Sequence, residues 1–376
     1  MTRRGLQKDR DPEQPTRVLF LPDYGDANPY QRELRLGLER LGVVVSGARP
    51  PGRDPLSVVR AWVAHGRPGV LHLHWTHSYL GQRVADAEST PRGRRSAIRA
   101  ALFLGQLRLL RGLGVRLVWT IHNLGHHEGA RDAQEVAVHR KLVGLADAVI
   151  CHCVAGVDAV TETYGLRAGD HGKLHVIPHG SYVGVYGPGV ERGDARRRLS
   201  IPAETKVLVF VGAIRPYKGI HELIAAFRDV PGPDAQLIVA GRAGTRQLAQ
   251  ELKEAASADG RISLRLGFVP DDELPVLLGA ADAVVLPFRD VLTSGSAVLA
   301  MSYGRAVVAP ALGCLPEALD PNGAVLYDAQ APGALGEAIV TALASDLEAM
   351  GARNLERARR LDWGTIARAT LALYRG

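Results

Sequence analysis

VLVFVGAIRPYKGI, residues 207–220, is the stretch that most constrains the fold. Its apolar, β-branched run ends at Gly212, a short loop carries Arg215 and Lys218, and Gly219 leads into a helical pattern. A buried strand followed by a tight loop and a helix is the repeating unit of a parallel α/β sheet. Cations that enter the start of a helix oppose its dipole, so we expect the two to hold an external anion such as a diphosphate. The alternative is a pair of solvated surface charges.

The alternation of strand and helix patterns extends over nearly the whole chain. Apolar, β-branched runs predict strands at 17–22, 43–48, 69–75, 115–122, 147–152 and 173–179, and again at 206–212, 235–241, 261–267, 282–288, 305–310 and 323–328. Helical periodicity fills several gaps, at 30–41, 96–111, 133–145, 219–227 and 296–303. The Gly-rich segment 181–194 separates the two series. We therefore predict an α/β protein with two doubly wound, parallel, Rossmann-like sheets that face each other across a cleft.

The composition is that of an ordinary globular protein of two-domain size. The chain has 376 residues, 46% of them hydrophobic and 23% charged. No apolar run approaches the roughly 18 residues that a membrane span requires. The formal net charge of +7 fits an anionic ligand, an anionic membrane surface or nucleic acid, although a high-GC genome also enriches arginine. We predict no nucleic-acid partner, because no recognised motif or basic stripe interleaved with aromatic residues is present.

Cysteine usage and the first residues indicate the compartment. Cys151, Cys153 and Cys314 are too few for a disulfide framework, so we expect buried thiols in a reducing cytoplasm. Half of a metal site is the less favoured interpretation, since no second cysteine pair exists. The charged segment 1–15 contains no apolar core of a secretory signal, and we expect it to be a disordered tail.

A second functional signal lies in the segment 286–310. Between its strand and its helix stand Thr293, Ser294, Gly295 and Ser296, a small turn rich in hydrogen-bond donors. Such a turn lets a ligand approach the backbone closely. A plain helix N-cap, which Ser294 would supply alone, is the alternative.

Four motifs in one order resemble the C-terminal half of family-4-type GT-B glycosyltransferases (glycosyl transferases group 1). They are RPYKGI, VAGRAG, LGFVPDDELPVLLGAADAVVLPF and GRAVVAPALGCLPEAL. The resemblance implies that Arg215 and Lys218 bind the diphosphate of a nucleotide-sugar donor, beside Gly212. It implies that the base and ribose lie near Gly241, Arg242 and the turn 293–296. The Arg stands nearer the Lys than in the commoner family pattern.

The sequence departs from the family in one respect. Many members carry two spaced glutamates after the strand that here ends near Pro287. The corresponding positions, counted without gaps, are Val291 and Leu299, neither of which can accept a hydrogen bond. Asp290 adjoins the first position and is our candidate substitute.

The resemblance also assigns the N-terminal half to the acceptor side. It implies an acceptor-side domain over 16–185, a nucleotide-sugar-binding domain over 186–360, and a C-terminal helix over 361–376 that returns to the N-terminal domain. In similar enzymes the loop after the first strand borders donor and acceptor, and Asp26, Asn28 and Tyr30 are the candidates there. The alternative is that Asn28 and the following proline only begin a helix.

Histidines gather at the predicted strand ends of the N-terminal half. His74, His122, His127 and His179 follow or end strands whose carboxyl edges converge, so we assign them to the acceptor and sugar side. His122 in TIHN matches a family histidine that lies against the transferred sugar, and could take the acceptor's proton or orient the sugar. We predict no metal site, because the HExxH spacing is absent.

The region Arg92–Arg111 combines six arginines with an apolar helical pattern. Some similar enzymes use such a helix to dock on membranes that carry lipid-linked acceptors. Apolar positions spread nearly all round it, as in a packed helix. We therefore expect a cytoplasmic protein and keep peripheral contact with the inner face of the plasma membrane as one interpretation.

These inferences predict a metal-independent hexosyltransferase that needs no cofactor. It would move a sugar from a UDP- or GDP-sugar to a hydroxyl of a glycan, lipid-linked or small-molecule acceptor. Arg215, Lys218 and the turn 293–296 would stabilise the departing diphosphate. Two alternatives stay open, a sugar-nucleotide epimerase and a sugar-nucleotide-binding protein that has lost catalysis, the latter because the glutamates are absent.

Overall fold

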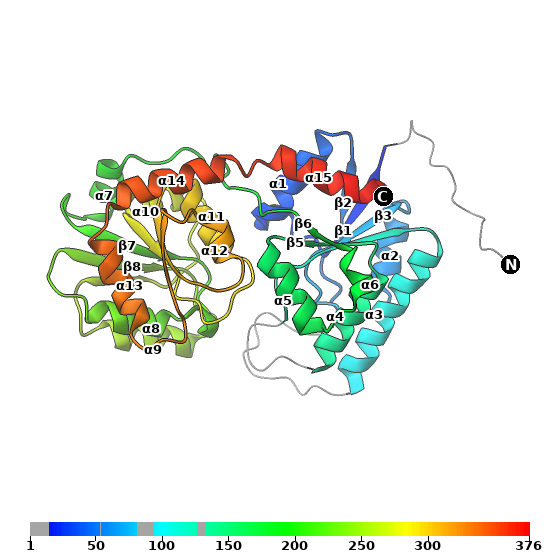
Figure 1. Ribbon diagram of the computed structural model, residues 1–376, viewed down its shortest axis with the longest axis horizontal. Helices are drawn as coiled ribbons and strands as arrows, with labels where there is room; N and C mark the ends of the chain where they lie inside the picture. The colour runs from blue at the N-terminus through cyan, green and yellow to red at the C-terminus, as the bar shows by residue number, and fades with distance from the viewer. Residues whose placement is uncertain (1–14, 53, 81–93, 126–132) are drawn as a thin grey trace.

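The computed structural model describes residues 15–52, 54–80, 94–125 and 133–376, which fold into two lobes (Figure 1). A six-stranded parallel sheet forms the centre of each lobe, so the predicted α/β class is confirmed. The tail predicted over 1–15 lies, except for its last residue, outside the described residues. Within the described ranges, no helix combines the length and apolarity needed to cross a bilayer.

The N-terminal lobe is built on the strand order β2-β1-β3-β4-β5-β6. Its strands are β1 (Arg17–Leu21), β2 (Val44–Gly47), β3 (Val70–Leu73), β4 (Arg116–Thr120), β5 (Ala148–Cys151) and β6 (Leu174–Val176). The helices between them are η1 (Gly25–Ala27), α1 (Pro29–Glu39), α2 (Ser57–Ala64), α3 (Arg94–Gly112), α4 (Ala133–Leu145), α5 (Val154–Tyr164) and α6 (Ala168–His171). All four residues of β3 are buried, as expected for a strand covered on both faces.

The C-terminal lobe has the order β12-β11-β10-β7-β8-β9, which is the Rossmann order read from the opposite edge. Its strands are β7 (Lys206–Val211), β8 (Ala235–Ala240), β9 (Ile262–Arg265), β10 (Ala283–Val285), β11 (Ala306–Pro310) and β12 (Ala324–Tyr327). Its helices are α7 (Arg192–Leu199), η2 (Pro216–Lys218), α8 (Ile220–Arg228), α9 (Arg246–Ala256), α10 (Leu274–Ala280), α11 (Gly295–Ser302), α12 (Leu315–Ala318), α13 (Ala334–Leu343) and α14 (Leu347–Arg359). Every strand predicted from the sequence has its counterpart here.

The chain returns to the N-terminal lobe between α14 and the last helix, α15 (Trp363–Arg375), which packs on α1 (Figure 1). Its Tyr374 is fully buried, with its hydroxyl 2.6 Å from Nδ1 of His72 on β3. Trp363 anchors the crossing, because its indole N–H donates to the carbonyl of Ser181 at 2.7 Å. The chain end is therefore part of the N-terminal core.

Hydrogen bonds also join the two lobes directly. Thr293 donates its hydroxyl hydrogen to the carbonyl of His122 at 2.9 Å. The Glu317 carboxylate accepts from the backbone N–H groups of Val154 and Ala155, the first residues of α5, at 2.9 and 2.6 Å. These hydrogen bonds join the lobes on either side of the cleft.

A disulfide between Cys153 and Cys314 joins the lobes covalently. The expectation of three buried thiols is therefore wrong for two of them and confirmed only for Cys151. The bonded residues are 161 positions apart in the sequence. They meet because β5 and β11 both end at the interlobe face, which a count of cysteines does not reveal.

Candidate active site between the lobes

The main cavity, of about 320 Å³, opens between the carboxyl ends of the two sheets. On the C-terminal side it is lined by residues that follow β7 and β10, the strands between which the order of that sheet reverses. Ligands of open parallel sheets bind at this reversal, where the loops of neighbouring strands diverge to opposite faces. On the N-terminal side the lining residues follow β3, belong to the end of β4 or the loop after it, or lie on α4.

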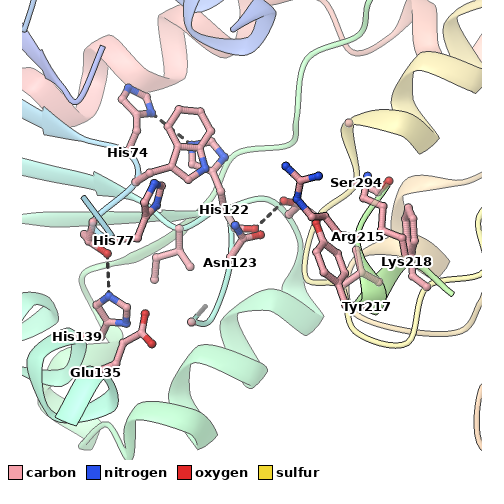
Figure 2. A pocket seen from close by; sticks show the side chains of 18 of the residues that line it. His74, His77, His122, Asn123, Glu135, His139, Arg215, Tyr217, Lys218 and Ser294 are labelled. Carbon is pink, nitrogen blue, oxygen red and sulfur yellow. Dashed lines mark hydrogen bonds between the residues drawn. The ribbon is translucent and has the colours of Figure 1, made fainter. Parts of the chain in front are cut away.

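The loop after β7 brings two cations to the cavity wall. Arg215 and Lys218 both line it, as the loop RPYK predicts (Figure 2). Gly212, at φ +141°, ends the strand without a side chain; a Cβ there would lie 3.5 Å from Nζ of Lys218 and 3.2 Å from Oγ of Ser296. The glycine thus leaves room for the ammonium to lie near the start of α11. Burial lowers the pKa of Lys218 to about 8, and the nearby positive charge of Arg215 is the second cause of the shift.

The turn 293–296 lies beside these cations, on the same lobe, and leads into α11. Ser294 caps the helix, because its hydroxyl accepts the Ala297 N–H at 3.1 Å. Ser296 donates to the carbonyl of Val211 at 3.2 Å, which ties the turn to β7. The cap interpretation and the binding interpretation are compatible, since Ser294, Gly295 and Ser296 all line the cavity.

Aromatic rings and imidazoles make the N-terminal wall. His74 and His122 both line it, and a hydrogen bond joins Nδ1 of His74 to Nε2 of His122 at 3.3 Å. The indole of Trp75 stacks on His122, with ring centres 4.2 Å apart. Burial lowers the pKa of both imidazoles well below the ordinary value, so both are neutral near pH 7.

A further part of this wall comes from α4. Glu135 and His139 are one helical turn apart, and both are buried and line the cavity (Figure 2). Nε2 of His139 lies 2.8 Å from the hydroxyl of Thr76, which fixes the imidazole. Burial lowers the pKa of His139 to about 4.

Several predicted site residues lie away from this cavity. Gly241 is buried behind it, where a Cβ would meet the Gly212 carbonyl at 1.8 Å, while Arg242, Asp290 and Asp26 are exposed and do not line it. Asn28 caps α1 by accepting the Gln31 N–H at 3.1 Å. That bond is the local helix-start role that the sequence left as an alternative.

Two further predicted residues, Tyr30 and His179, lie next to the cavity without lining it, and a third lies outside the described residues. Tyr30 is buried beneath the cavity, edge-on to His122 with ring centres 4.8 Å apart. His179 lines a second interlobe cavity of about 220 Å³. His127 lies outside the described residues.

The positions that correspond to the family glutamates are apolar in space as well as in sequence. Val291 lines the cavity, and Leu299, on α11, is buried in the core. Asp290 is exposed and makes no part of the cavity lining.

Sequence reasoning missed several lining residues: Trp75, Thr76, Trp119, Asn123, Glu135, His139, Tyr217 and Phe288. Trp75, Thr76 and Asn123 come within three residues of a strand end, and Tyr217 stands between Arg215 and Lys218, so position alone could have indicated them. For Glu135 and His139 only the one-turn spacing was visible. Among the described residues, no three His, Cys, Asp or Glu side chains are grouped as metal ligands.

Two Rossmann-like lobes with a cavity between the carboxyl edges of their sheets are the architecture of the GT-B class. Comparisons with known proteins agree. Residues 205–345 match the family model described as glycosyl transferases group 1. A GDP-mannose:glycolipid 4-beta-D-mannosyltransferase of Xanthomonas campestris is 30% identical over 272 residues, which cover 72% of this chain and 70% of the relative.

Solved structures share the fold over nearly their whole length. A sucrose-phosphate synthase from Thermosynechococcus elongatus has a TM-score of 0.75 at 22% identity and covers 96% of this chain and 98% of its own. Anabaena Alr3699/HepE in complex with UDP has a TM-score of 0.70 at 19% identity, with 96% and 99% covered. The chain belongs to the group 1 glycosyltransferases, and it is a hexosyltransferase-type enzyme that uses a nucleotide-sugar donor.

Proposed function

We propose that this enzyme transfers a hexosyl group from a UDP- or GDP-sugar to a hydroxyl of a glycan, lipid-linked or small-molecule acceptor, without an obligatory metal ion. The observation that carries the proposal is the placement of Arg215 and Lys218 on the cavity wall, beside the start of α11. Together they offer charge and backbone N–H groups to a diphosphate. The mannosyltransferase relative names GDP-mannose, and Alr3699/HepE binds UDP, which supports both nucleotides as candidates.

The chemistry follows from where charge develops. As the bond between the sugar and the diphosphate breaks, negative charge grows on the leaving phosphate. Preorganised cations stabilise that charge more than they stabilise the bound donor, which lowers the barrier. Closure of the lobes around the donor would exclude water that otherwise hydrolyses it.

We also propose that the N-terminal lobe contacts an anionic membrane surface through α3. Ile98, Leu102, Leu109 and Leu113 are exposed along this helix and the residue after it, next to exposed Arg108. Exposed leucines beside arginine are the composition of an interfacial helix. A lipid-linked acceptor would then reach the cleft from the bilayer.

The decisive experiment measures nucleotide binding and donor turnover in single variants. Arg215→Ala and Lys218→Ala should each weaken binding of UDP or GDP by roughly 10-fold or more, since a charge-assisted hydrogen bond contributes about 1.5–3 kcal/mol. Arg246→Ala, which removes an exposed cation on α9, is the matched control and should change nothing. Isothermal titration with UDP and GDP, and release of the nucleoside diphosphate from GDP-mannose or UDP-glucose, are the measurements.

Two outcomes would contradict the proposal. Wild-type affinity in both variants would show that the loop after β7 does not hold the diphosphate. Conversion of the donor sugar without release of a nucleoside diphosphate would identify the epimerase instead.

A further inference from the structure

Glu135 is the only carboxylate among the described residues that line the main cavity. It lies in the first turn of α4, with an exposed fraction of 6%, and Figure 2 shows it on the N-terminal wall, facing the same space as Arg215 from the other side. A Cβ on Gly125, in the loop after β4, would lie 3.5 Å from its Oε2. The carboxylate therefore lies where the loop after β4 borders the cavity.

A hydroxyl that attacks from the side opposite the leaving group cannot pass its proton to the departing diphosphate, so a group of the protein must take it. The C-terminal lobe offers none at the two positions where many members carry glutamates, because they hold Val291 and Leu299. His74 and His122 hold an added proton weakly here, because burial lowers the pKa of both, and a hydrogen bond joins one ring to the other. The other imidazoles on the described cavity wall are His77 and His139, and Nε2 of His139 is engaged by the Thr76 hydroxyl at 2.8 Å. Glu135 is the carboxylate on the same wall.

We propose that Glu135 is the general base of the transfer and that the reaction inverts the anomeric carbon. This inference rests on the proposed function. The acceptor oxygen attacks the anomeric carbon from the N-terminal side while the bond to the diphosphate breaks on the C-terminal side. The hydroxyl proton passes to the Glu135 carboxylate, and the electron pair of the broken bond leaves with the nucleoside diphosphate toward Arg215 and Lys218.

Opposite placement of base and leaving group is what inversion needs. The base and the cations come from different lobes and line one cavity. An attack on the face opposite the leaving group forms the new bond as the old one breaks, with inverted configuration. A donor with an α-linked sugar would give a β-linked product.

Hydrolysis of the donor tests the assignment without knowledge of the acceptor, because water needs the same deprotonation. With GDP-mannose or UDP-glucose, whichever the wild type binds, Glu135→Gln should lower hydrolysis by about 10²–10⁴-fold. Affinity for GDP or UDP should stay within about 2-fold of the wild type, because the diphosphate contacts lie on the other lobe. Glu162→Gln, the same change at an exposed carboxylate on α5, is the matched control and should retain wild-type hydrolysis.

Sodium azide separates a base from a structural residue. Azide is already an anion and needs no deprotonation, so it should restore turnover of Glu135→Gln and yield a β-glycosyl azide. Proton NMR should show that the wild type first releases the β-anomer of the free sugar.

Three outcomes would overturn the inference: wild-type hydrolysis in Glu135→Gln, release of the α-anomer, or azide rescue of His77→Ala in place of Glu135→Gln. His77 is the rival base, since it lines the same wall with Nε2 3.3 Å from the Tyr24 hydroxyl. If the wild type bound neither GDP nor UDP, the proposed function itself would fail. Normal nucleotide binding with an indifferent Glu135 would reject the base alone.

Discussion

Lys218 has a charge that its surroundings make sensitive to pH. Its Nζ lies over the rings of Phe288 and Phe210, 5.3 and 5.8 Å from their centres, and close to Arg215. Burial is the main cause that lowers its pKa to about 8, and the Arg215 charge is the second. An incoming diphosphate would stabilise the ammonium and raise this pKa again.

Nucleoside diphosphate affinity should therefore fall as the pH rises through about 8. The complex binds a proton that the free protein has lost above this pH, so affinity drops by up to about tenfold per pH unit until the pKa of the complex is reached. Titration of UDP or GDP between pH 7 and 9.5 measures the slope. Lys218→Arg should flatten it, because a guanidinium keeps its charge. A constant wild-type affinity over this range would show that Lys218 does not lose its proton near pH 8.

In helix α3 the structure separates buried from exposed apolar residues, which the sequence showed only as an apolar pattern nearly all round the helix. Phe103, Leu104, Leu107 and Leu110 are buried against the lobe, while Leu102 and Leu109 are 39% and 55% exposed. The apolar residues of this helix thus fall into two groups, one packed in the core of the lobe and one exposed to solvent.

The exposed leucines should mediate binding to anionic vesicles. The double variant Leu102→Glu and Leu109→Glu should reduce co-sedimentation with phosphatidylglycerol vesicles by roughly tenfold, because two apolar contacts are lost and two negative charges are added. Val340→Glu, at an exposed apolar position of α13 in the other lobe, is the control. Equal binding of wild type and double variant would show that α3 does not meet the membrane.

At the scale of the whole molecule, the Cys153–Cys314 disulfide joins the two lobes beside the cleft. Together with the Glu317 contact to α5, it restrains opening around the active site. The bond joins residues 161 positions apart, so it strongly lowers the conformational entropy of the unfolded chain.

Reduction should destabilise the wild type and leave Cys153→Ser unchanged. We expect dithiothreitol to lower the free energy of unfolding of the wild type by about 2–4 kcal/mol, measured by thermal or denaturant unfolding. Thiol titration of the unfolded protein should find one free thiol before reduction and three after it. Three thiols without reductant would show that the bond does not form.

The sequence by itself determined the strands, the order of the motifs and the loop of Arg215 and Lys218. These features are local, because a buried strand must be apolar and β-branched, and a loop between strand and helix needs Gly212 and Gly219 at fixed positions. The spacing of residues along one element was therefore enough to predict them.

Only the tertiary structure decided which parts of distant elements meet. It placed Glu135 in the cavity, joined Cys153 to Cys314, and left Asp290 exposed. Helical periodicity shows which residues share a face, but the partner of that face depends on how two sheets pack, and residues far apart in sequence carry no local sign of their contact.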